Sequence, residues 1–163
     1  NILSVPHKTL RQTALPVESV DDDIKRLMDD MFETMIHENR GVGLAANQVG
    51  VLKRVIVCHY EQEHKTISLK MANPCITHMS EDIFTLTEGC LSIPQAWSEV
   101  KRPQDILVTY LDETGKPQEL KATHELSSII QHEIDHLDGR LFIDHLSSTK
   151  KKLLLDRAIK ATR

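Results

Sequence analysis

The sequence predicts an α+β fold in which short strands, paired mainly antiparallel, surround a central helix, with a further helix at the C-terminus. Three stretches space their apolar residues with helical periodicity, and several short runs of strand-forming residues lie between them. Strands that cluster between helices favour an α+β arrangement. The chain has 163 residues, 40% hydrophobic and 27% charged, so we expect one domain that spans residues 1–163.

The first helix is predicted to begin at a cap formed by Ser19 or Asp21. It is predicted to end near Glu38–Arg40, because Gly41 follows and glycine commonly ends a helix. The residues expected on its buried face recur at helical spacing: Ile24, Leu27, Met28, Met31, Phe32, Met35 and Ile36.

Five runs with strand character are predicted next, and they cover residues 54–59, 67–72, 83–87, 106–111 and 117–121. Asp112–Gly115 has the composition of a hairpin turn between the last two runs. The dipeptides Asn73-Pro74, Ile93-Pro94 and Arg102-Pro103 are expected to punctuate the strands, because X-Pro pairs mark turns and loops.

Two more helices complete the prediction. One covers about Glu125 to Leu137 and is ended by Asp138-Gly139. The other runs from Ser148 to the end of the chain, and this segment of about residues 148–163 carries a local excess of positive charge against one acid, Asp156. Its basic residues are Lys150, Lys151, Lys152, Arg157, Lys160 and Arg163.

Composition excludes several classes of protein. The net charge of −4 does not suggest a DNA-binding protein, and no apolar run reaches the roughly 18 residues of a membrane span. The N-terminus lacks the basic-then-apolar pattern of a secretory signal. Three cysteines are too few for a disulfide scaffold, so we expect a reducing cytoplasm and read Cys58 and Cys75 as small buried residues.

The sharpest chemical signal is the H-E-x-x-H motif at residues 132–136, which falls inside the second predicted helix. His132 and His136 project from one helix face, so both imidazoles can reach one metal ion. Glu133 would lie beside that ion, where its carboxylate can take a proton from a bound water. The motif therefore predicts a metal-binding helix at the centre of the fold.

A third metal ligand has to come from elsewhere, because no downstream residue stands at the spacing of the longer H-E-x-x-H-x-x-G-x-x-H motif. Cys90, in the turn-like stretch 88–94, is a candidate, since two histidines, one thiolate and a water form a known catalytic geometry. Taken alone, Cys90 is better explained as a small buried residue.

The segment 41–48 is unusual in its glycines and small residues, which allow another chain segment or a ligand to approach the backbone closely. It lacks the G-K-[ST] of a phosphate-binding loop.

Together, GVGLAANQ (41–48), EGCLS (88–92) and QHEIDHLDG (131–139) closely resemble the three signature motifs of bacterial peptide deformylases, in the same order. The resemblance covers the full chain and extends to the C-terminal helix of the Gram-negative type. It implies the α+β deformylase fold and removal of the N-formyl group from the formyl-methionine of nascent polypeptides. It also implies Fe2+ as the native metal, with Zn2+ or Ni2+ as substitutes.

Residue roles follow from the resemblance. Cys90, His132 and His136 would hold the metal, Glu133 would move the proton, and the Gln48 amide and the Leu91 backbone N–H would stabilise the oxyanion. The peptide would lie extended against Val42, Gly43 and Leu44. Glu88 would pair with Arg102 to hold the Cys90 loop in place.

One stretch departs from the family. Where the family is usually small and apolar before the third motif, this chain has His124–Ser128, followed by Ile129. Glu125, Ser128 and Ile129 fall at positions that shape the pocket for the first substrate side chain, so the pocket is expected to be more polar or more open. The chain could therefore be a specialised deformylase with altered first-side-chain specificity.

Two other functions compete with this one. A related metallopeptidase or metalloamidase would use the same motif, but the Cys ligand disfavours it. A binding protein with a structural metal site would need four protein ligands and would leave Glu133 without a task. The basic C-terminal helix is either a solvated face or a surface that docks on ribosomal RNA near the point where the substrate emerges.

Overall fold

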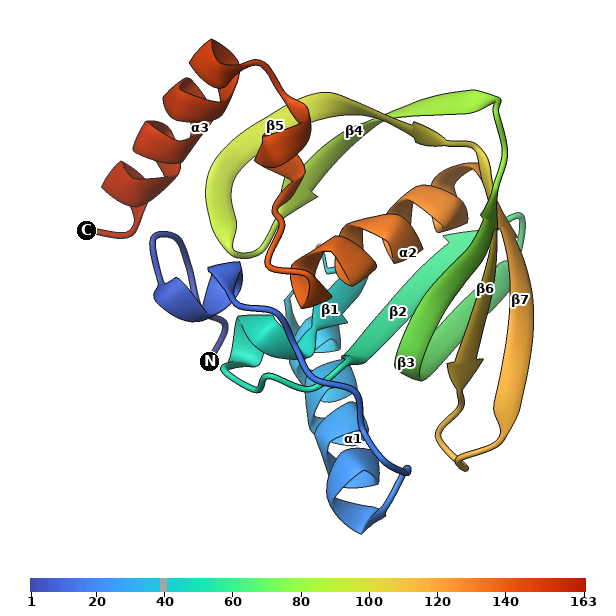
Figure 1. Cartoon of the computed structure of the whole chain (residues 1–163). Coiled ribbons are helices and arrows are strands. Elements are labelled where there is room, and N and C mark those ends of the chain that lie inside the picture. The colour runs from blue at the N-terminus through green and yellow to red at the C-terminus, as the bar shows by residue number, and fades with distance from the viewer. Residues whose placement is uncertain (39–40) are drawn as a thin grey trace.

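A computed structural model describes residues 1–38 and 41–163 and has the predicted α+β architecture (Figure 1). The described residues contain three helices and seven strands, together with the short 3-10 turns η1 (Lys8–Arg11), η2 (Ala46–Val49) and η3 (Phe142–His145). In chain order the main elements are α1 (Asp22–His37), β1 (Gly43–Ala45), β2 (Val55–Gln62), β3 (Lys65–Met79), β4 (Ile83–Cys90), β5 (Ile93–Pro103), β6 (Asp105–Leu111), β7 (Pro117–Thr123), α2 (His124–Leu137) and α3 (Ser148–Ala161).

The strands form two antiparallel sheets. A five-stranded sheet has the order β1-β2-β3-β6-β7, so that β1 lies at an edge, and β4 and β5 form a separate two-stranded sheet. Helix α2 lies between the two sheets, with the β4–β5 hairpin curving over it (Figure 1). The prediction of mainly antiparallel strands around a central helix is confirmed.

Helix α2 is buried on nearly all sides, which is unusual for a helix that carries so many polar residues. Its apolar residues Ile130, Ile134 and Leu137 pack into the core of the five-stranded sheet, where they contact residues such as Ile56 and Met71. On the side facing the hairpin, His132, Glu133 and His136 are at most 9% exposed. Because burying polar groups without partners is costly, this arrangement calls for a bound group or a hydrogen-bond network.

The β5 strand was missed by the sequence reading, which treated Ile93-Pro94 and Arg102-Pro103 as interruptions. Both prolines lie at the ends of the strand, positions where a missing N–H is tolerated. The inward-facing residues of β5 include Ser98 and Arg102 as well as Ala96 and Val100. The alternation of buried and exposed positions in β5 is therefore not visible in the sequence as an apolar pattern, because two of the buried side chains are polar. The three-residue strand β1 was also missed.

Helix α1 begins as predicted, since the Asp21 side chain accepts a hydrogen bond from the Ile24 N–H at 2.9 Å. It ends at His37, and the rest of the predicted end, residues 39–40, lies outside the described residues. The face prediction was wrong at Ile36, which is 46% exposed. It was correct for the residues that the helix buries: Ile24, Met28, Met31 and Met35.

Strand β3 continues through Asn73-Pro74, where a break was expected. Asn73 adopts a positive φ of 50°, and the pairing with β6 shifts register between Ala72 and Cys75, so a bulge accommodates the proline. Cys58 is fully buried as predicted, but Cys75, just after the bulge, is exposed, and that prediction was wrong.

Helix α3 packs on β5 through Leu154 and Ala158, which join a core cluster with Ile93, Val100 and Phe142. Its N-cap Ser147 accepts a hydrogen bond from the Lys150 N–H. Among the described residues, no helix is long and apolar enough to cross a membrane.

Candidate functional site

Three side chains with metal-binding atoms come together where β4 ends against α2. His132 and His136 lie one helical turn apart, with ring centroids separated by 5.1 Å. Cys90 is the last residue of β4, and a register shift after Gly89 makes it pair with Ile93 at the end of the ladder. The Cys90 Sγ lies 3.4 Å from His136 Nε2, and the donor atoms of the three residues are all within 4.8 Å of one another.

This donor set fits a divalent transition metal. One thiolate and two imidazoles suit iron, zinc or nickel better than magnesium or calcium, which prefer oxygen ligands. The His132 Nδ1 hydrogen bonds to Glu88 Oε2 at 2.8 Å, which leaves Nε2 for the cluster. Three protein donors leave a coordination position open, as catalytic rather than structural sites do.

The two histidines differ in their proton affinity. Burial and the nearby charge of His132 lower the pKa of His136 well below its usual value, which keeps it in the neutral form that binds metals. Burial also acts to lower the pKa of His132, but hydrogen bonds with Cys90 and Glu88 outweigh burial and raise it. The hydrogen-bond partners of His132 therefore favour its protonated form, whereas the surroundings of His136 favour the neutral form.

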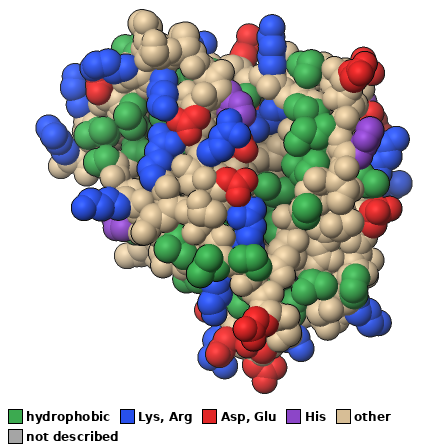
Figure 2. Space-filling view, in the orientation of Figure 1, with side chains coloured by type: hydrophobic (Ala, Val, Ile, Leu, Met, Phe, Trp, Pro, Cys, Tyr) green, Lys and Arg blue, Asp and Glu red, His purple; other side chains and the backbone are tan. Residues whose placement is uncertain are grey.

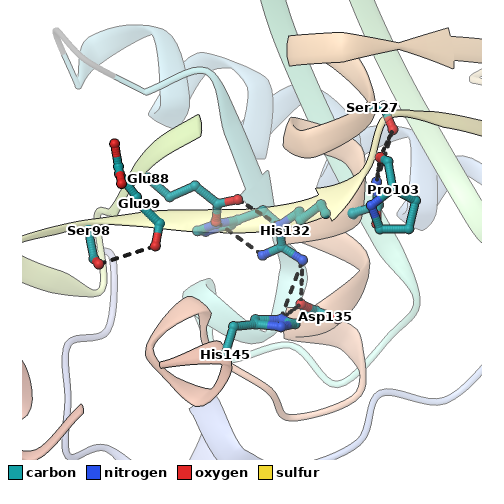
Figure 3. A network of polar contacts seen from close by, with 10 residues as sticks. Glu88, Ser98, Glu99, Pro103, Ser127, His132, Asp135 and His145 are labelled. Atoms are coloured by element: carbon teal, nitrogen blue, oxygen red, sulfur yellow. Dashed lines mark hydrogen bonds and ion pairs between the residues drawn. The ribbon is translucent and has the colours of Figure 1, made fainter. Parts of the chain in front are cut away.

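A network of charged side chains contacts His132 through Glu88 (Figure 3). Arg102, only 3% exposed, donates to both Glu88 oxygens at 2.6 and 3.0 Å and to Asp135 Oδ2 at 2.9 Å. His145, from η3, contacts the same Asp135 oxygen at 2.8 Å. Burial would raise the pKa of Glu88, but the hydrogen bonds from His132 and Arg102 outweigh it and lower the pKa to about 2. Glu88 is thus held ionised, and it orients the His132 ring.

Glu133 faces the cluster from α2 and is 4% exposed. Its Oε2 is buried with no hydrogen-bond partner among the described residues. Burial, the largest cause, raises the pKa of Glu133 to about 7, against an opposing charge on His132. A Cβ at Gly43 would lie 2.5 Å from Glu133 Oε1, so the glycine of β1 is what lets the carboxylate reach this position.

The Gln48 amide lies on the other side of Cys90. Its Oε1 accepts a hydrogen bond from the Ala45 N–H at 2.9 Å, which fixes the orientation of the amide. The Nε2 group then lies 3.0 Å from Ser92 Oγ and 3.6 Å from Cys90 Sγ. A preoriented N–H donor at this distance can stabilise negative charge that develops beside the cluster.

A cavity of about 500 Å³ opens onto these groups. Most residues expected to bind substrate line it, namely Val42, Gly43, Glu125, Ser128 and Ile129, and so does Leu91, the expected backbone donor to the oxyanion. Leu44 does not, because its side chain is fully buried in a core cluster beneath β1. The backbone of Leu44 still lies in an edge strand, whose outer side has no neighbour in the described sheet.

The two polar residues of the departing stretch have different surroundings. Glu125 is exposed, and its Oε2 accepts a hydrogen bond from Tyr60 Oη at 2.8 Å. Ser128 is 1% exposed, and its Oγ has no partner among the described residues. The cavity wall that these residues share with Ile129 is therefore partly polar.

Sequence reasoning missed three residues that shape the site, namely Tyr60, Trp97 and Asp135, and it weighed His145 only as a downstream metal ligand, whereas His145 contacts Asp135. Asp135 lies inside the motif that was recognised, but its bond to Arg102 joins residues 33 positions apart. Trp97 lies in the strand that was not predicted. The one signal available in the sequence was composition, because Trp97 is the single tryptophan of the chain.

Comparisons with known proteins agree on one family. A family model described as polypeptide deformylase matches residues 1–152. Among curated relatives, the peptide deformylase of Pelagibacter ubique is 46% identical over 161 residues, covering 98% of this chain and 93% of that protein. The peptide deformylase of Rhizobium meliloti is 44% identical over 163 residues, with 99% and 93% covered.

Solved structures have the same fold. The crystal structure of peptide deformylase from Ehrlichia chaffeensis superposes with a TM-score of 0.95 at 40% identity, and covers 100% of this chain and 96% of that one. A second structure of that protein, in complex with actinonin, has a TM-score of 0.95 at 42% identity, with 100% and 97% covered.

Proposed function

Because the chain belongs to the polypeptide deformylase family, we propose that its cavity binds the N-terminus of formylated nascent polypeptides and that the residues around Cys90 hydrolyse the formyl amide. The enzyme is a peptide deformylase, a hydrolase that releases formate and leaves a free amino group. The observation that carries the proposal is the convergence of three metal donors, the buried Glu133 carboxyl and the Gln48 amide on one cavity.

The proposed metal is Fe2+, held by Cys90, His132 and His136, with Zn2+ or Ni2+ as substitutes. Imidazole and thiolate donors suit all three ions. A divalent ion in this site supplies Lewis-acid chemistry, since it lowers the pKa of water and polarises the formyl carbonyl.

Glu133 is the proposed proton carrier. It accepts a proton from the attacking water and passes it to the leaving amine, which requires an acid and a base form of similar stability. Burial provides this by raising the pKa of Glu133 to about 7. The Gln48 side chain and the Leu91 backbone N–H are the proposed donors to the oxyanion, and the bond from the Ala45 N–H to Gln48 Oε1 keeps the amide pointed toward it.

The substrate is proposed to bind as an additional strand. The free edge of β1 lies beside the cavity, so a peptide can pair with the backbone of Val42, Gly43 and Leu44. The formyl group would lie between Gly43 and Leu91. The first side chain would enter the part of the cavity lined by Glu125, Ser128 and Ile129.

We further propose that residues 1–163 form one domain and that the protein is located in the cytoplasm. We also propose that α3 contacts the ribosome. Lys and Arg side chains gather over α3 on the left of Figure 2, and the apolar side of this helix is buried against β5. Lys151 and Lys152 form ion pairs with Asp144 and Asp156, so part of the local charge is internally balanced. Neutralising Lys150–Lys152 should weaken salt-sensitive co-sedimentation with ribosomes, and unchanged co-sedimentation would refute the contact.

The decisive assay is formate release from formyl-Met-Ala-Ser under anaerobic conditions by protein loaded with Fe2+ or Ni2+. Glu133→Ala should bind the metal and lose activity by about 10²–10⁴-fold. The enzyme should leave internal peptide bonds intact, which distinguishes it from a metallopeptidase. Bound metal without formate release, even with varied first side chains, would overturn the assignment.

A further inference from the structure

His145 is the surface end of the charged network that contacts His132. Its side chain is 25% exposed, whereas that of Asp135 is 15% exposed and that of Arg102 is 3% exposed. Beyond Arg102 the network continues through Glu88 to His132 (Figure 3). A chain of polar contacts therefore runs from the surface to a proposed metal ligand.

The His145 ring donates a hydrogen bond to Asp135. The contact joins His145 Nε2 to Asp135 Oδ2 at 2.8 Å. A carboxylate only accepts hydrogen bonds, so the proton of this contact lies on Nε2. Arg102 Nη1 donates to the same oxygen at 2.9 Å. Asp135 is thus held between two donors, one from η3 and one from β5.

Asp135 in turn limits the movement of the Arg102 guanidinium. Arg102 binds the two oxygens of Glu88 through Nε and Nη2, at 2.6 and 3.0 Å. The bond from Nη1 to Asp135 is a third contact of this planar group, and it opposes a tilt of the guanidinium away from Glu88. Glu88 Oε2 also contacts His132 Nδ1 at 2.8 Å. The orientation of the His132 ring therefore depends on contacts that begin at His145.

A second contact from the same turn reaches His132 directly. Phe142, the first residue of η3, is fully buried, and its ring stacks on that of His132 with a centroid separation of 6.1 Å and an interplanar angle of 20°. Because η3 spans only four residues, a shift of this turn would disturb both contacts. The turn therefore holds His132 in two ways, by ring packing and through the polar network.

We propose that His145 is a positioning residue that raises the affinity of the Cys90, His132 and His136 cluster for its metal. This inference rests on the metal site of the proposed function and adds to it a residue that does not touch the ion. A ligand ring that is already held in its binding orientation loses less freedom when the metal binds. Groups that orient metal ligands typically contribute about 10- to 100-fold in affinity, and His145 acts through three intervening side chains, so we expect about tenfold.

A merely structural role for His145 makes a different prediction. If the ring only anchored η3 on α2, its removal would lower the free energy of unfolding and leave the metal affinity unchanged. Metal affinity and stability in urea are therefore measured on the same variants.

The test measures the dissociation constant for Zn2+ by competition with a chelator at one fixed pH. His145→Leu removes the donor and should weaken Zn2+ binding by about tenfold. His145→Gln keeps an N–H group at the place of Nε2 and should retain most of the affinity. Lys151→Met is the matched control, because it removes an ion pair of Asp144, the neighbour of His145 in η3, and should leave the affinity unchanged.

A double-mutant cycle tests the route through Glu88. In a Glu88→Gln background, His145→Leu should weaken Zn2+ binding by less than about twofold, because the carboxylate through which His145 acts is gone. A full loss in that background, equal losses in the Leu and Gln variants, or wild-type affinity in His145→Leu would overturn the proposal. So would a loss in Lys151→Met as large as that in His145→Leu.

The outcomes for the wild-type protein separate this inference from the proposed function. Zn2+ binding together with no formate release from any formylated peptide, after loading with Fe2+ or Ni2+, would refute the function and leave the role of His145 intact. A wild-type protein that binds no metal would refute both.

Discussion

Replacing Gly43 with alanine should disable the enzyme while leaving its metal donors in place. The new Cβ would lie 2.5 Å from Glu133 Oε1 and 2.8 and 2.9 Å from the Cγ and Cδ atoms. Normal contacts between such atoms are about 3.5 Å, so the carboxylate has to move by about 1 Å. A displacement of this size in a positioned group typically costs about 100-fold in rate. We therefore expect Gly43→Ala to lower kcat/KM by about two orders of magnitude.

A double-mutant cycle separates this cause from a general disturbance of β1. Gly43→Ala should reduce formate release strongly in the native background and only slightly in a Glu133→Ala background, because the clash partner is then gone. Metal content should stay the same in all four proteins. Wild-type activity in Gly43→Ala, or an equal loss in both backgrounds, would refute the reasoning.

Three further perturbations test the support of the site. Arg102→Met removes the partner of a buried carboxylate, so it should lower the free energy of unfolding by about 3 kcal/mol in urea titrations; a loss below about 1 kcal/mol would contradict the buried ion pair with Glu88. Burial would raise the pKa of Asp144, but hydrogen bonds lower it from 3.8 to about 2, and the bond from Arg11 has the largest effect among them. Its stabilising effect should therefore be complete above about pH 4 and disappear as the pH falls through 2, so Asp144→Asn should cost about 1 kcal/mol at pH 7 and nothing near pH 2; a pH-independent cost would count against this assignment. Cys90→Ala should weaken metal binding at least about 100-fold by competition with a chelator, and stoichiometric metal after dialysis would show that Cys90 is not a ligand.

A local sequence pattern was enough to predict α2 as the metal-binding helix. The spacing of His132 and His136 is a property of any α-helix, so recognising the helix was enough to place both rings on one face. The order of the three motifs led to Cys90, which short-range reasoning alone had favoured as a buried residue. The strand β5 failed to stand out, because Ser98 and Arg102 occupy inward positions where the pattern expects apolar residues.

The resemblance predicted that Arg102 pairs with Glu88, and the structure has this ion pair, but the burial of Arg102 in a strand and its bond to Asp135 were not predicted. Arg102 is buried because Glu88 and Asp135 neutralise it, and neither contact is local in sequence. A guanidinium in a strand normally indicates a solvent-facing position, and only its partners make burial tolerable. The structure was needed to reveal that a charged network, rather than an apolar face, joins β5 to α2.

The sequence by itself determined which chemical groups are available: the spacing of H-E-x-x-H predicts two imidazoles and a carboxyl on one helix, and the resemblance of the three motifs to one family added Cys90 and Gln48 as expected participants. Tertiary structure decided how those groups are tuned. The pKa of Glu133 depends on burial between two sheets, and its position depends on a glycine that lies 90 residues earlier in the chain. Trp97 likewise became part of the cavity only through its pairing with Gly89. Desolvation and close approach arise from which segments pack together, and no local pattern encodes them.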